Sequence, residues 1–533
     1  MQKHLIIVIL LIISIPIIAQ TTYSAEQIEI HKLTNNWLNT DNAAGLGFVN
    51  FHQHGNSELG YENQSGDLHR AQEGNSKSGI RFISERYDKI NKNWLSWGSF
   101  EFKMNTEENR TWSNVFNTYN SSPYLFGDSI PGRYDQQSFD LHAKICRKIN
   151  EKWSTGISFD YFAGDMSRLR DARTRTFIAD YSIAPGTVYK IDDSNLIGLT
   201  AGFRFEKEKM PSIITVQTDP DINYYFFLGN ENANAVKDAY KGFDRQFINK
   251  EYFGSLQYNF KNNQADWLTS LEYSSRNQEV LGSERESPGE YKAQNIRLNS
   301  KVNIFLNRKL LNIDLKSSYK NGYANEFLQE LVTIRDTVKH DVSKSWNTLY
   351  VYQKRYTTTT YSADLNINLR NLLNNGTDYS WSGGIDGQFY GFSNKYQLPY
   401  SAFENQRLRI GLNGSVRVFN KNQHKVNLHA KGGFTLSMFD NLTLNSLATT
   451  TPGLGSSTFE VATYKIANEI LVPDMRFYKE NVKDLSADVR YSFPIKQKKN
   501  MLTGLFKAYF GIQQGNQIGS WTIAGISFGI ITL

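Results

Sequence analysis

Residues 407–439 alternate between apolar and polar side chains along almost their whole length. The even positions from Leu408 to Val418 are mostly apolar, whereas the odd positions carry mainly arginine, asparagine and serine. After the polar run 420–425 the alternation restarts and continues to Met438. A period of two indicates β-strands with one apolar face and one polar face. The apolar face would meet a second sheet in a soluble sandwich. In an outer-membrane barrel it would meet lipid, and the polar face would line the lumen.

Short polar turns separate such strands, and longer stretches lie between the resulting hairpins. Eight turns rich in Asn, Asp and Lys are recognisable at 88–93, 149–152, 192–195, 261–266, 306–310, 372–378, 420–425 and 496–500. The longer stretches include 107–134, 211–250, 328–355 and 441–480. Short turns at one rim and long loops at the other are typical of outer-membrane barrels.

The fold class predicted from this pattern is all-β. We expect a single transmembrane up-and-down antiparallel β-barrel with short periplasmic turns and long extracellular loops. Eight hairpins, a first strand at 45–55 and a last strand at the C-terminal end give about eighteen strands. A range of roughly 14–18 strands is compatible with the pattern, because some segments could be hairpins within loops.

The N-terminal residues predict export from the cytoplasm. Lys3 precedes an uncharged apolar run from Leu5 to Ile18, which resembles a secretory signal peptide at 1–19. Residues 20–44 are then expected to form a short periplasmic N-terminal segment, with a short helix in the periplasm or in the mouth of the barrel. Residues 45–533 would form the barrel, in the outer membrane of a Gram-negative bacterium. Because only about 25 residues precede the first strand, no plug domain is expected.

Composition agrees with a membrane barrel. The chain has 30 Tyr and 33 Phe, enough for aromatic girdles at both membrane interfaces, and only 11 Pro. Cys146 is the single cysteine, so an internal disulfide is excluded, and we place it on the lipid face of a strand. The net charge of +7 fits contact with lipopolysaccharide or a basic lumen. No aromatic-basic module indicates nucleic acid, so no nucleic-acid partner is expected.

Two histidines form a candidate metal site. His52 and His54 share a parity and are expected to point into the lumen near the outer end of the first strand. Side chains at i and i+2 lie on one face of a strand and could hold one metal ion, with Glu58 nearby. The alternative interpretation is two polar residues of the lumen wall.

An arginine-rich segment is a candidate site for an anion or a partner. "GDMSRLRDARTR" carries Arg168, Arg170, Arg173 and Arg175 beside two aspartates, between two strands at a rim. These side chains could bind an anionic solute, a lipopolysaccharide phosphate or a partner protein. Alternatively, Arg–Asp pairs could fix an extracellular loop in the mouth of the barrel.

Charged residues on the predicted lumen face would control a pore. In an open channel they would set ion selectivity, whereas in a filled barrel they would pair with one another. They are Arg297, Lys316, Asp364, Arg370, Arg407, Arg409, Arg417 and Lys431.

Motifs for catalysis are missing from the sequence. It contains no HExxH or P-loop motif and no cysteine pair. We therefore assign no catalytic residue, expect no cofactor, and predict that the protein is not an enzyme.

Two stretches carry a resemblance to known barrels. "NAAGLGFVNF" (42–51) and the block 134–186, which begins "YDQQSFDLHAKICRK", resemble an uncharacterised outer-membrane β-barrel family of Bacteroidota with a domain-of-unknown-function label. Members of that family tend to lie near genes for TonB-dependent uptake, which implies a TonB-dependent receptor or a surface lipoprotein as a partner. "NAAGLG" is also similar to the "NPAGL" element of FadL-like barrels, with Ala43 at the proline position.

The sequence thus predicts a role in transport. The first interpretation is a porin-like channel, or an accessory barrel in nutrient or metal uptake. The alternative is a structural or assembly barrel that binds a partner and has no open pore. An enzyme at the barrel rim is the third.

Overall fold

The computed structural model describes most of the chain beyond the predicted signal peptide, which lies outside the described residues. Described are residues 24–211, 213, 223–237, 244–282, 286–336, 341–373, 376–453, 455–497 and 500–532. No helix within these residues is both long and apolar enough to span a membrane.

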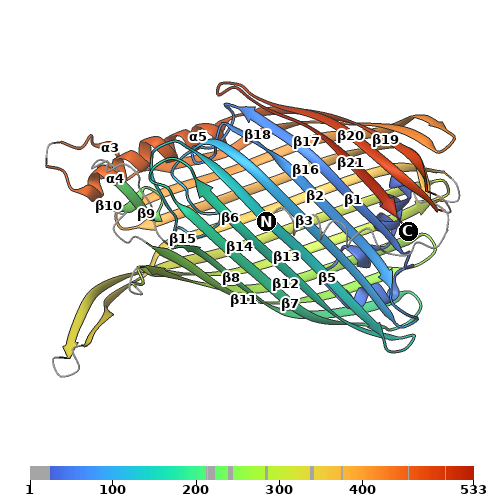
Figure 1. Ribbon diagram of the computed structural model, residues 1–533, viewed down its shortest axis with the longest axis horizontal. Coiled ribbons are helices and arrows are strands. Elements are labelled where there is room, and N and C mark those ends of the chain that lie inside the picture. The colour runs from blue at the N-terminus through green and yellow to red at the C-terminus, as the bar shows by residue number, and fades with distance from the viewer. Residues whose placement is uncertain are drawn as a thin grey trace.

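Eighteen antiparallel strands form one closed barrel, which confirms the predicted fold class and strand number (Figure 1). The sheet closes because β1 pairs with β2 on one side and with the last strand, β21, on the other. The barrel strands are β1 (His54–Gly66), β2 (Ser76–Lys89), β3 (Trp94–Arg110), β5 (Gly132–Lys148), β6 (Trp153–Arg168), β7 (Arg175–Lys190), β8 (Asn195–Met210), β11 (Arg245–Lys261), β12 (Ala265–Gly282), β13 (Gly289–Leu306), β14 (Lys309–Asp336), β15 (Asp341–Leu373), β16 (Asp378–Gln397), β17 (Tyr400–Lys421), β18 (His424–Thr443), β19 (Val482–Gln497), β20 (Asn500–Gly515) and β21 (Ser520–Thr532).

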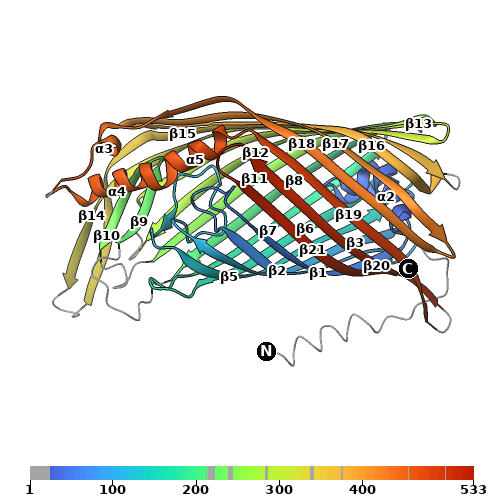
Figure 2. The ribbon, with the colours of Figure 1, turned by 90° about the horizontal axis from the view of Figure 1, so that it is seen from above.

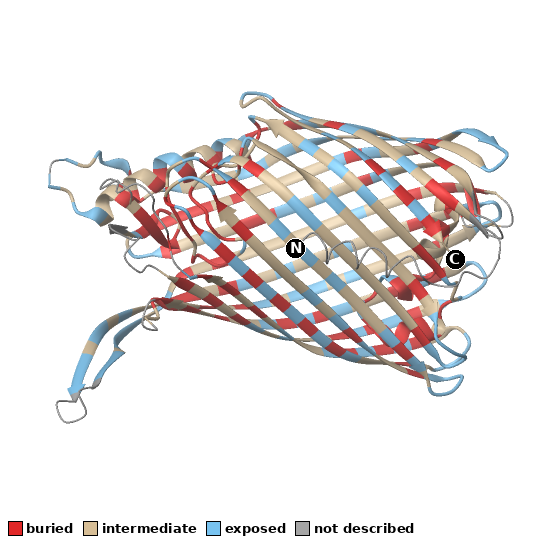
Figure 3. Ribbon diagram, viewed as in Figure 1, coloured by how far each residue is buried: buried red, intermediate tan, exposed pale blue. Residues whose placement is uncertain are grey.

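The two faces of the strands differ as the alternation predicts. In β7, Phe177, Tyr181 and Ile183 are exposed on the outside, while Asp180 and Ser182 face inward and are buried. β8, β11 and β12 show the same alternation, and along other strands many positions are of intermediate exposure (Figure 3). An apolar outer face and a polar inner face are typical of barrels that span a membrane.

All eight predicted turns join neighbouring strands at one end of the barrel, which we call the turn rim. They connect β2–β3, β5–β6, β7–β8, β11–β12, β13–β14, β15–β16, β17–β18 and β19–β20. The opposite end, the loop rim, carries most of the longer connections. The predicted asymmetry between the two rims is therefore confirmed.

The predicted first strand at 45–55 is wrong. Residues Ala43–Phe48 form a 3-10 helix, η2, which is capped by the Asn42 side chain, and β1 begins only at His54. Gly45 and Gly47 alternate with larger residues, which gives the period of a strand. In the structure, however, another side chain lies close to each of the two glycines. A Cβ at Gly47 would lie 2.8 Å from Ser154 Cβ in the wall.

The N-terminal segment lies inside one end of the barrel, which corresponds to the expected helix in the mouth and not to a segment outside the barrel. Its helices α2 (Ala25–Thr34) and η1 (Asn36–Asn39) precede η2, and we call residues 24–49 the plug. Figure 2 shows α2 within the turn-rim end of the barrel. The predicted short helix is present, but the expectation that there is no plug is corrected.

The plug reaches walls on different sides of the lumen. The Trp37 indole N–H donates to Asn259 on β11 (3.0 Å), and the Asn42 amide donates to the Thr187 carbonyl on β7 (3.1 Å). On another side, Glu29 lies 3.4 Å from Arg370 on β15. Cys146 is buried beside the Ala44 carbonyl, so the predicted lipid-facing position of this cysteine is wrong. A segment of about 25 residues therefore contacts several sides of an eighteen-stranded lumen at one end.

Substitution Gly45→Ala should loosen the plug. A Cβ at Gly45 would lie 2.5 Å from Trp37 Cε3. Because the buried indole cannot move without losing its wall contacts, we expect a cost of about 1–3 kcal/mol in plug docking. The rate of limited proteolysis within residues 24–49, in the detergent-folded protein, measures how far the plug is loosened. Gly254→Ala is the control, since its Cβ would meet only Thr200 O, at 3.7 Å. Equal cleavage rates for the two variants would contradict the prediction.

The loop rim is covered by a second set of inserted elements, which we call the cap. It comprises residues 67–75, 111–131, 223–237 and 446–479. These include the small sheet β4 (Phe126–Gly127), β9 (Asn223–Gly229) and β10 (Asn232–Lys237) and the helices α3 (Ser446–Thr449), α4 (Thr458–Ile466), η6 (Ala467–Leu471) and α5 (Val472–Lys479). Aromatic residues of β4 and β9 pack against wall residues such as Phe247 and Tyr356. Helix α4 covers β10 (Figure 1).

Strands β14 and β15 continue beyond the wall as a free hairpin, seen at the lower left of Figure 1. The pairing of β14 with β13 ends at Glu326, and the pairing of β15 with β16 begins only at Tyr356. Between these points the two strands pair only with each other. We call residues 327–336 and 341–353 the hairpin arm. It corresponds to the stretch 328–355 that the sequence marked as a long loop.

Candidate functional site

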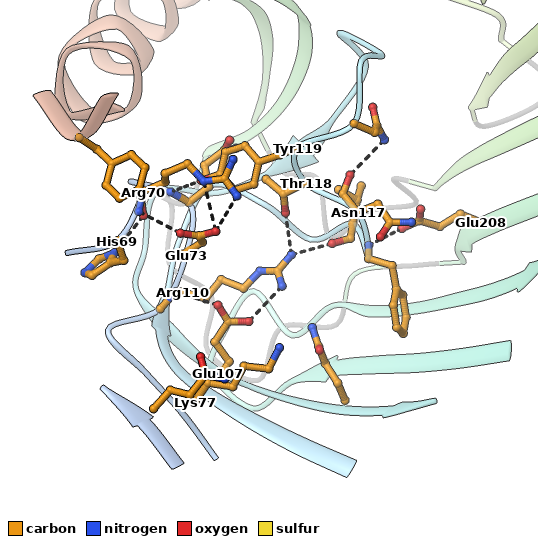
Figure 4. Close-up of a pocket in the computed structure, with 18 of the residues that line it drawn as sticks. His69, Arg70, Glu73, Lys77, Glu107, Arg110, Asn117, Thr118, Tyr119 and Glu208 are labelled. Carbon is orange, nitrogen blue, oxygen red and sulfur yellow. Dashed lines mark hydrogen bonds and ion pairs between the residues drawn. The ribbon is translucent and has the colours of Figure 1, made fainter. Parts of the chain in front are cut away.

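A cavity of about 840 Å³ lies in the lumen beneath the cap, and we call it the chamber (Figure 4). Its lining comes from the cap and from strands around most of the barrel, among them β1, β3, β8, β12, β16 and β20. A smaller cavity of about 370 Å³ adjoins it and shares Arg70, Gln72 and Tyr119. Because the two cavities share lining residues, we take the lumen beneath the cap as the candidate site.

Charged residues line the chamber in equal numbers of each sign. The cations are Arg70, Lys77, Arg110 and Arg276, and the carboxylates are Glu73, Glu107, Glu206 and Glu208. Three ion pairs join them: Arg70 to Glu73 at 2.7 Å, Arg110 to Glu107 at 3.2 Å and Arg276 to Glu206 at 2.9 Å. Three of the four cations that line the chamber are therefore paired with a carboxylate.

Arg110 organises the cap loop that borders the chamber. Its guanidinium, at the end of β3, donates to the Ser113 carbonyl (3.1 Å), the Val115 carbonyl (2.6 Å) and the Thr118 hydroxyl (3.0 Å). The Phe116 amide of the same loop donates to Glu208 on β8 at 2.8 Å. The loop is thus tied to the wall on two sides, and both ties face the chamber (Figure 4).

Arg70 joins two parts of the cap. Its guanidinium lies 3.2 Å from the centre of the Tyr119 ring and donates to the Tyr478 hydroxyl of α5 at 3.3 Å. Beside it, the Ala71 amide donates to Asp474 of α5 at 2.7 Å. Burial raises the pKa of Asp474 to about 7. Docking of α5 on the loop 67–75 therefore involves a carboxyl group that titrates near neutrality.

The contact between α5 and this loop should weaken as the pH rises. The docked state holds the Asp474 proton more tightly than the free carboxyl, whose ordinary pKa is 3.8. The contribution of this proton to docking is therefore complete below about pH 4 and is lost as the pH rises through about 7. We expect faster limited proteolysis of the cap at about pH 8 than at about pH 6. Asp474→Asn should remove that difference, and the exposed control Asp67→Asn should keep it. A difference that persists in Asp474→Asn would contradict the prediction.

The predicted histidine pair lies at the opposite end from the one expected. Because β1 begins at His54, both His52 and His54 lie at the turn rim beside the plug. The ring of His31 on α2 lies 4.8 Å from His52 and 5.8 Å from His54, centre to centre. Burial, with the two other histidines facing it, lowers the pKa of His31 to about 3. Glu58 is four residues further along β1, about 13 Å by strand geometry. Within the described ranges no three His, Cys, Asp or Glu side chains are arranged to hold a metal ion.

The predicted arginine-rich site is divided between a buried contact and an exposed rim. Arg168 is fully buried and pairs with Asp128 of the cap. The other three remain exposed: Arg173 contacts Asp171 (2.9 Å), Arg175 contacts Asp165 (2.5 Å), and Arg170 donates to the Pro131 carbonyl (3.2 Å). These contacts correspond to the interpretation in which Arg–Asp pairs fix a loop in the barrel mouth.

Most of the predicted lumen charges are paired. Arg409 bridges Asp386 and Asp484, and Lys431 also reaches Asp386, at 3.4 Å. Arg297 pairs with Glu272, and Lys316 lies opposite Asp364 across the β14–β15 ladder. Three bind inserted elements: Arg370 and Arg417 reach Glu29 and Glu26 of the plug, and Arg407 donates to the Glu480 carbonyl after α5. Of the two possibilities, these contacts fit the filled barrel.

One further cluster joins a histidine to carboxylates on the wall. His142 Nδ1 lies 2.6 Å from Asp160, and its Nε2 lies 3.2 Å from Asp140. The Ser182 hydroxyl donates to Asp160 at 2.6 Å and not to His142. A serine nucleophile needs the imidazole as its proton acceptor, so this order of contacts does not form a catalytic triad.

Comparisons with known proteins place the chain in a family. The profile of a family of unknown function, DUF6850, matches residues 43–531. No curated protein sequence matches the chain. Among solved structures, the copper transporter OprC has a TM-score of 0.37 at 9% identity, covering 90% of this chain and 82% of that chain. The outer membrane transporter YddB from Escherichia coli has a TM-score of 0.39 at 8% identity, with coverages of 90% and 81%. The FrpB iron transporter from Neisseria meningitidis has a TM-score of 0.38 at 10% identity, with coverages of 92% and 83%. Likenesses at this level carry no argument about the function of this chain.

Proposed function

Starting from the fact that the chain belongs to the DUF6850 family of unknown function, we propose that it is an outer-membrane barrel that takes up a small polar solute through a closed chamber. The closed antiparallel sheet with an apolar outside supports a membrane location. Short turns at one rim support an orientation with the turn rim in the periplasm. The cap then faces outward and the plug faces the periplasm.

The observation that carries this proposal is the chamber itself. It has a volume of about 840 Å³ and is lined by polar and aromatic side chains inside the lumen, with cap residues on its outer side. The plug occupies the turn-rim end through contacts with several walls. A solute would enter when the cap moves, bind in the chamber, and leave when the plug moves. This differs from a porin, in which the lumen stays open.

Labelling of a cysteine in the chamber tests whether it is closed. In a Cys146→Ser background, Gln513→Cys places a thiol in the chamber and Gln517→Cys places one at the loop rim. We expect a small charged methanethiosulfonate reagent to label the chamber thiol much more slowly than the rim thiol. Replacing 446–479 by a short Gly/Ser linker should abolish the difference. Equal rates in the intact protein would contradict the closed chamber.

A second function is favoured by the hairpin arm. Leu331, Ile334 and Leu349 of the arm are 38%, 59% and 59% exposed. A two-stranded ribbon without packing on its faces is marginally stable in water, so a partner would stabilise it. The alternative function is therefore a partner-binding barrel, with a TonB-dependent receptor or a surface lipoprotein as the expected partner.

Native mass spectrometry distinguishes this second function from the first. The protein would be extracted from its own membrane in mild detergent, with and without residues 329–348. A complex that is lost on shortening, while the barrel stays heat-modifiable, supports the partner-binding role. A monomer in both preparations argues against it.

A further inference from the structure

We propose that the ligand of the chamber is a neutral oligosaccharide. The inference rests on the proposed uptake function and adds the chemical class of the solute. Three properties of the lining carry it: open aromatic rings, charges that neutralise one another, and a large set of amide side chains.

Aromatic rings inside the lumen remain open to the chamber. Tyr119 in the cap is 36% exposed and Tyr390 on β16 is 42% exposed, and both line the chamber. Phe477 of α5 and Trp521 of β21 complete the aromatic part of the lining. One face of the Tyr119 ring is covered by the Arg70 guanidinium, which fixes the ring in place. Open, fixed rings offer flat apolar surfaces on which the C–H face of a sugar ring can stack.

The charges of the chamber do not select a charged ligand. Three of its four arginine and lysine side chains already have a carboxylate partner within 3.2 Å. Lys77 makes no ion pair within the part of the chain that the structure describes, and Glu208 accepts a hydrogen bond from the Phe116 amide. An anion or a cation would have to break an existing pair or bind a single lysine or glutamate. A neutral ligand avoids that cost.

Hydrogen-bonding groups surround the aromatic rings. The amides of the lining are Gln64, Gln72, Gln136, Gln278, Gln513, Asn117 and Asn120. An amide both donates and accepts, and the guanidinium–carboxylate pairs present fixed donors and acceptors side by side. Neighbouring hydroxyl groups of a sugar need this combination, whereas a purely apolar ligand would leave the polar wall unsatisfied.

The size of the chamber sets the length of the ligand. Ligand pockets commonly measure about 300–1,000 Å³, so about 840 Å³ lies near the upper end. The adjoining cavity beside Tyr119 extends this space. A single sugar ring would fill only part of it. We therefore assign a chain of several sugar rings to the chamber.

An oligosaccharide array with a matched pair of tyrosine variants tests the proposal. The full-length, detergent-folded protein would be applied to neutral, sulfated and carboxylated oligosaccharides, and binders titrated by intrinsic tryptophan fluorescence, since Trp521 lines the chamber. We expect neutral members to bind and Tyr390→Ala to weaken binding about 10-fold. Tyr181→Ala is the control, because Tyr181 is similarly exposed (40%) but faces outward on β7.

Three results would overturn the proposal: binding of charged members only, binding of no member, or equal affinity of the Tyr390→Ala variant and the unaltered protein. The labelling of Gln513→Cys separates this outcome from a failure of the proposed function. If the chamber thiol is protected but no neutral oligosaccharide binds, the ligand class is wrong and the closed uptake barrel stands. If the chamber thiol reacts as fast as the Gln517→Cys thiol at the loop rim, the proposal of a closed chamber is itself wrong.

Discussion

Replacing Asp378 by asparagine is expected to lower the free energy of unfolding by about 3–5 kcal/mol. Asp378 on β16 is 1% exposed and accepts hydrogen bonds from Arg417 at 2.6 and 3.0 Å and from Lys425 at 2.9 Å. Both cations also lie 3.6 Å from Glu26 of the plug. Without the Asp378 charge, two buried cations would share one distant carboxylate. Removing one partner of a buried ion pair is costly because the other charge stays uncompensated.

Urea unfolding of the folded barrel, followed by heat-modifiable gel mobility, measures this effect. Asp193→Asn is a matched control, because Asp193 also contacts a lysine, Lys190, at 2.6 Å, but its side chain is 98% exposed. A change within about 0.5 kcal/mol is expected for the control. Similar small effects for both variants would show that water reaches the Asp378 site and that the plug does not seal it.

Replacing Arg168 by glutamine is expected to release the cap loop 111–131, at a cost of about 3–5 kcal/mol. The Arg168 and Asp128 side chains are both 0% exposed, and Arg168 also donates to the Ile130 carbonyl at 2.8 Å. Glutamine would leave Asp128 buried without a cation. Asp128 in turn accepts from the Ile130 amide at 3.0 Å, so the turn 128–130 depends on the pair.

Limited proteolysis within 111–131, together with urea unfolding, measures the effect of Arg168→Gln. Arg175→Gln is the control, because the side chains of Arg175 and Asp165 are 60% and 35% exposed and their ion pair is expected to contribute less than about 1 kcal/mol. If both variants were cleaved at the rate of the unaltered protein, Arg168 would not fix the loop.

The wall of the barrel could be predicted because the sequence features that specify its strands and turns are local. The alternation of apolar and polar residues shows which residues of a strand lie on each face. Asn and Lys between alternating segments identify turns such as 420–425 and 149–152. Counting eight such turns gave the strand number that the structure shows. The misplaced first strand also has a local cause. Residues 43–48 mix glycine with apolar side chains as a strand can, and only their close fit to Trp37 and Ser154 reveals another role.

The plug and the chamber were not predictable, because their contacts join distant parts of the chain. Trp37 meets Asn259, 222 positions away, and Ala71 meets Asp474, 403 positions away. The spacing of residues along the sequence does not predict contacts between such distant positions. The lumen arginines show the same limit: alternation placed Arg409 and Arg417 on the inner face, but not the carboxylates that they bind.

The measurement that tests the central claim most directly is single-channel conductance of the purified, detergent-folded barrel in a planar bilayer. The intact chain should show no steady open channel, because the plug and the cap occupy the two ends of the lumen. A variant without 24–49 and with 446–479 replaced by a short linker should conduct steadily, since eighteen strands enclose a wide lumen. Steady, large openings of the intact protein would contradict the closed chamber and restore the interpretation as a porin.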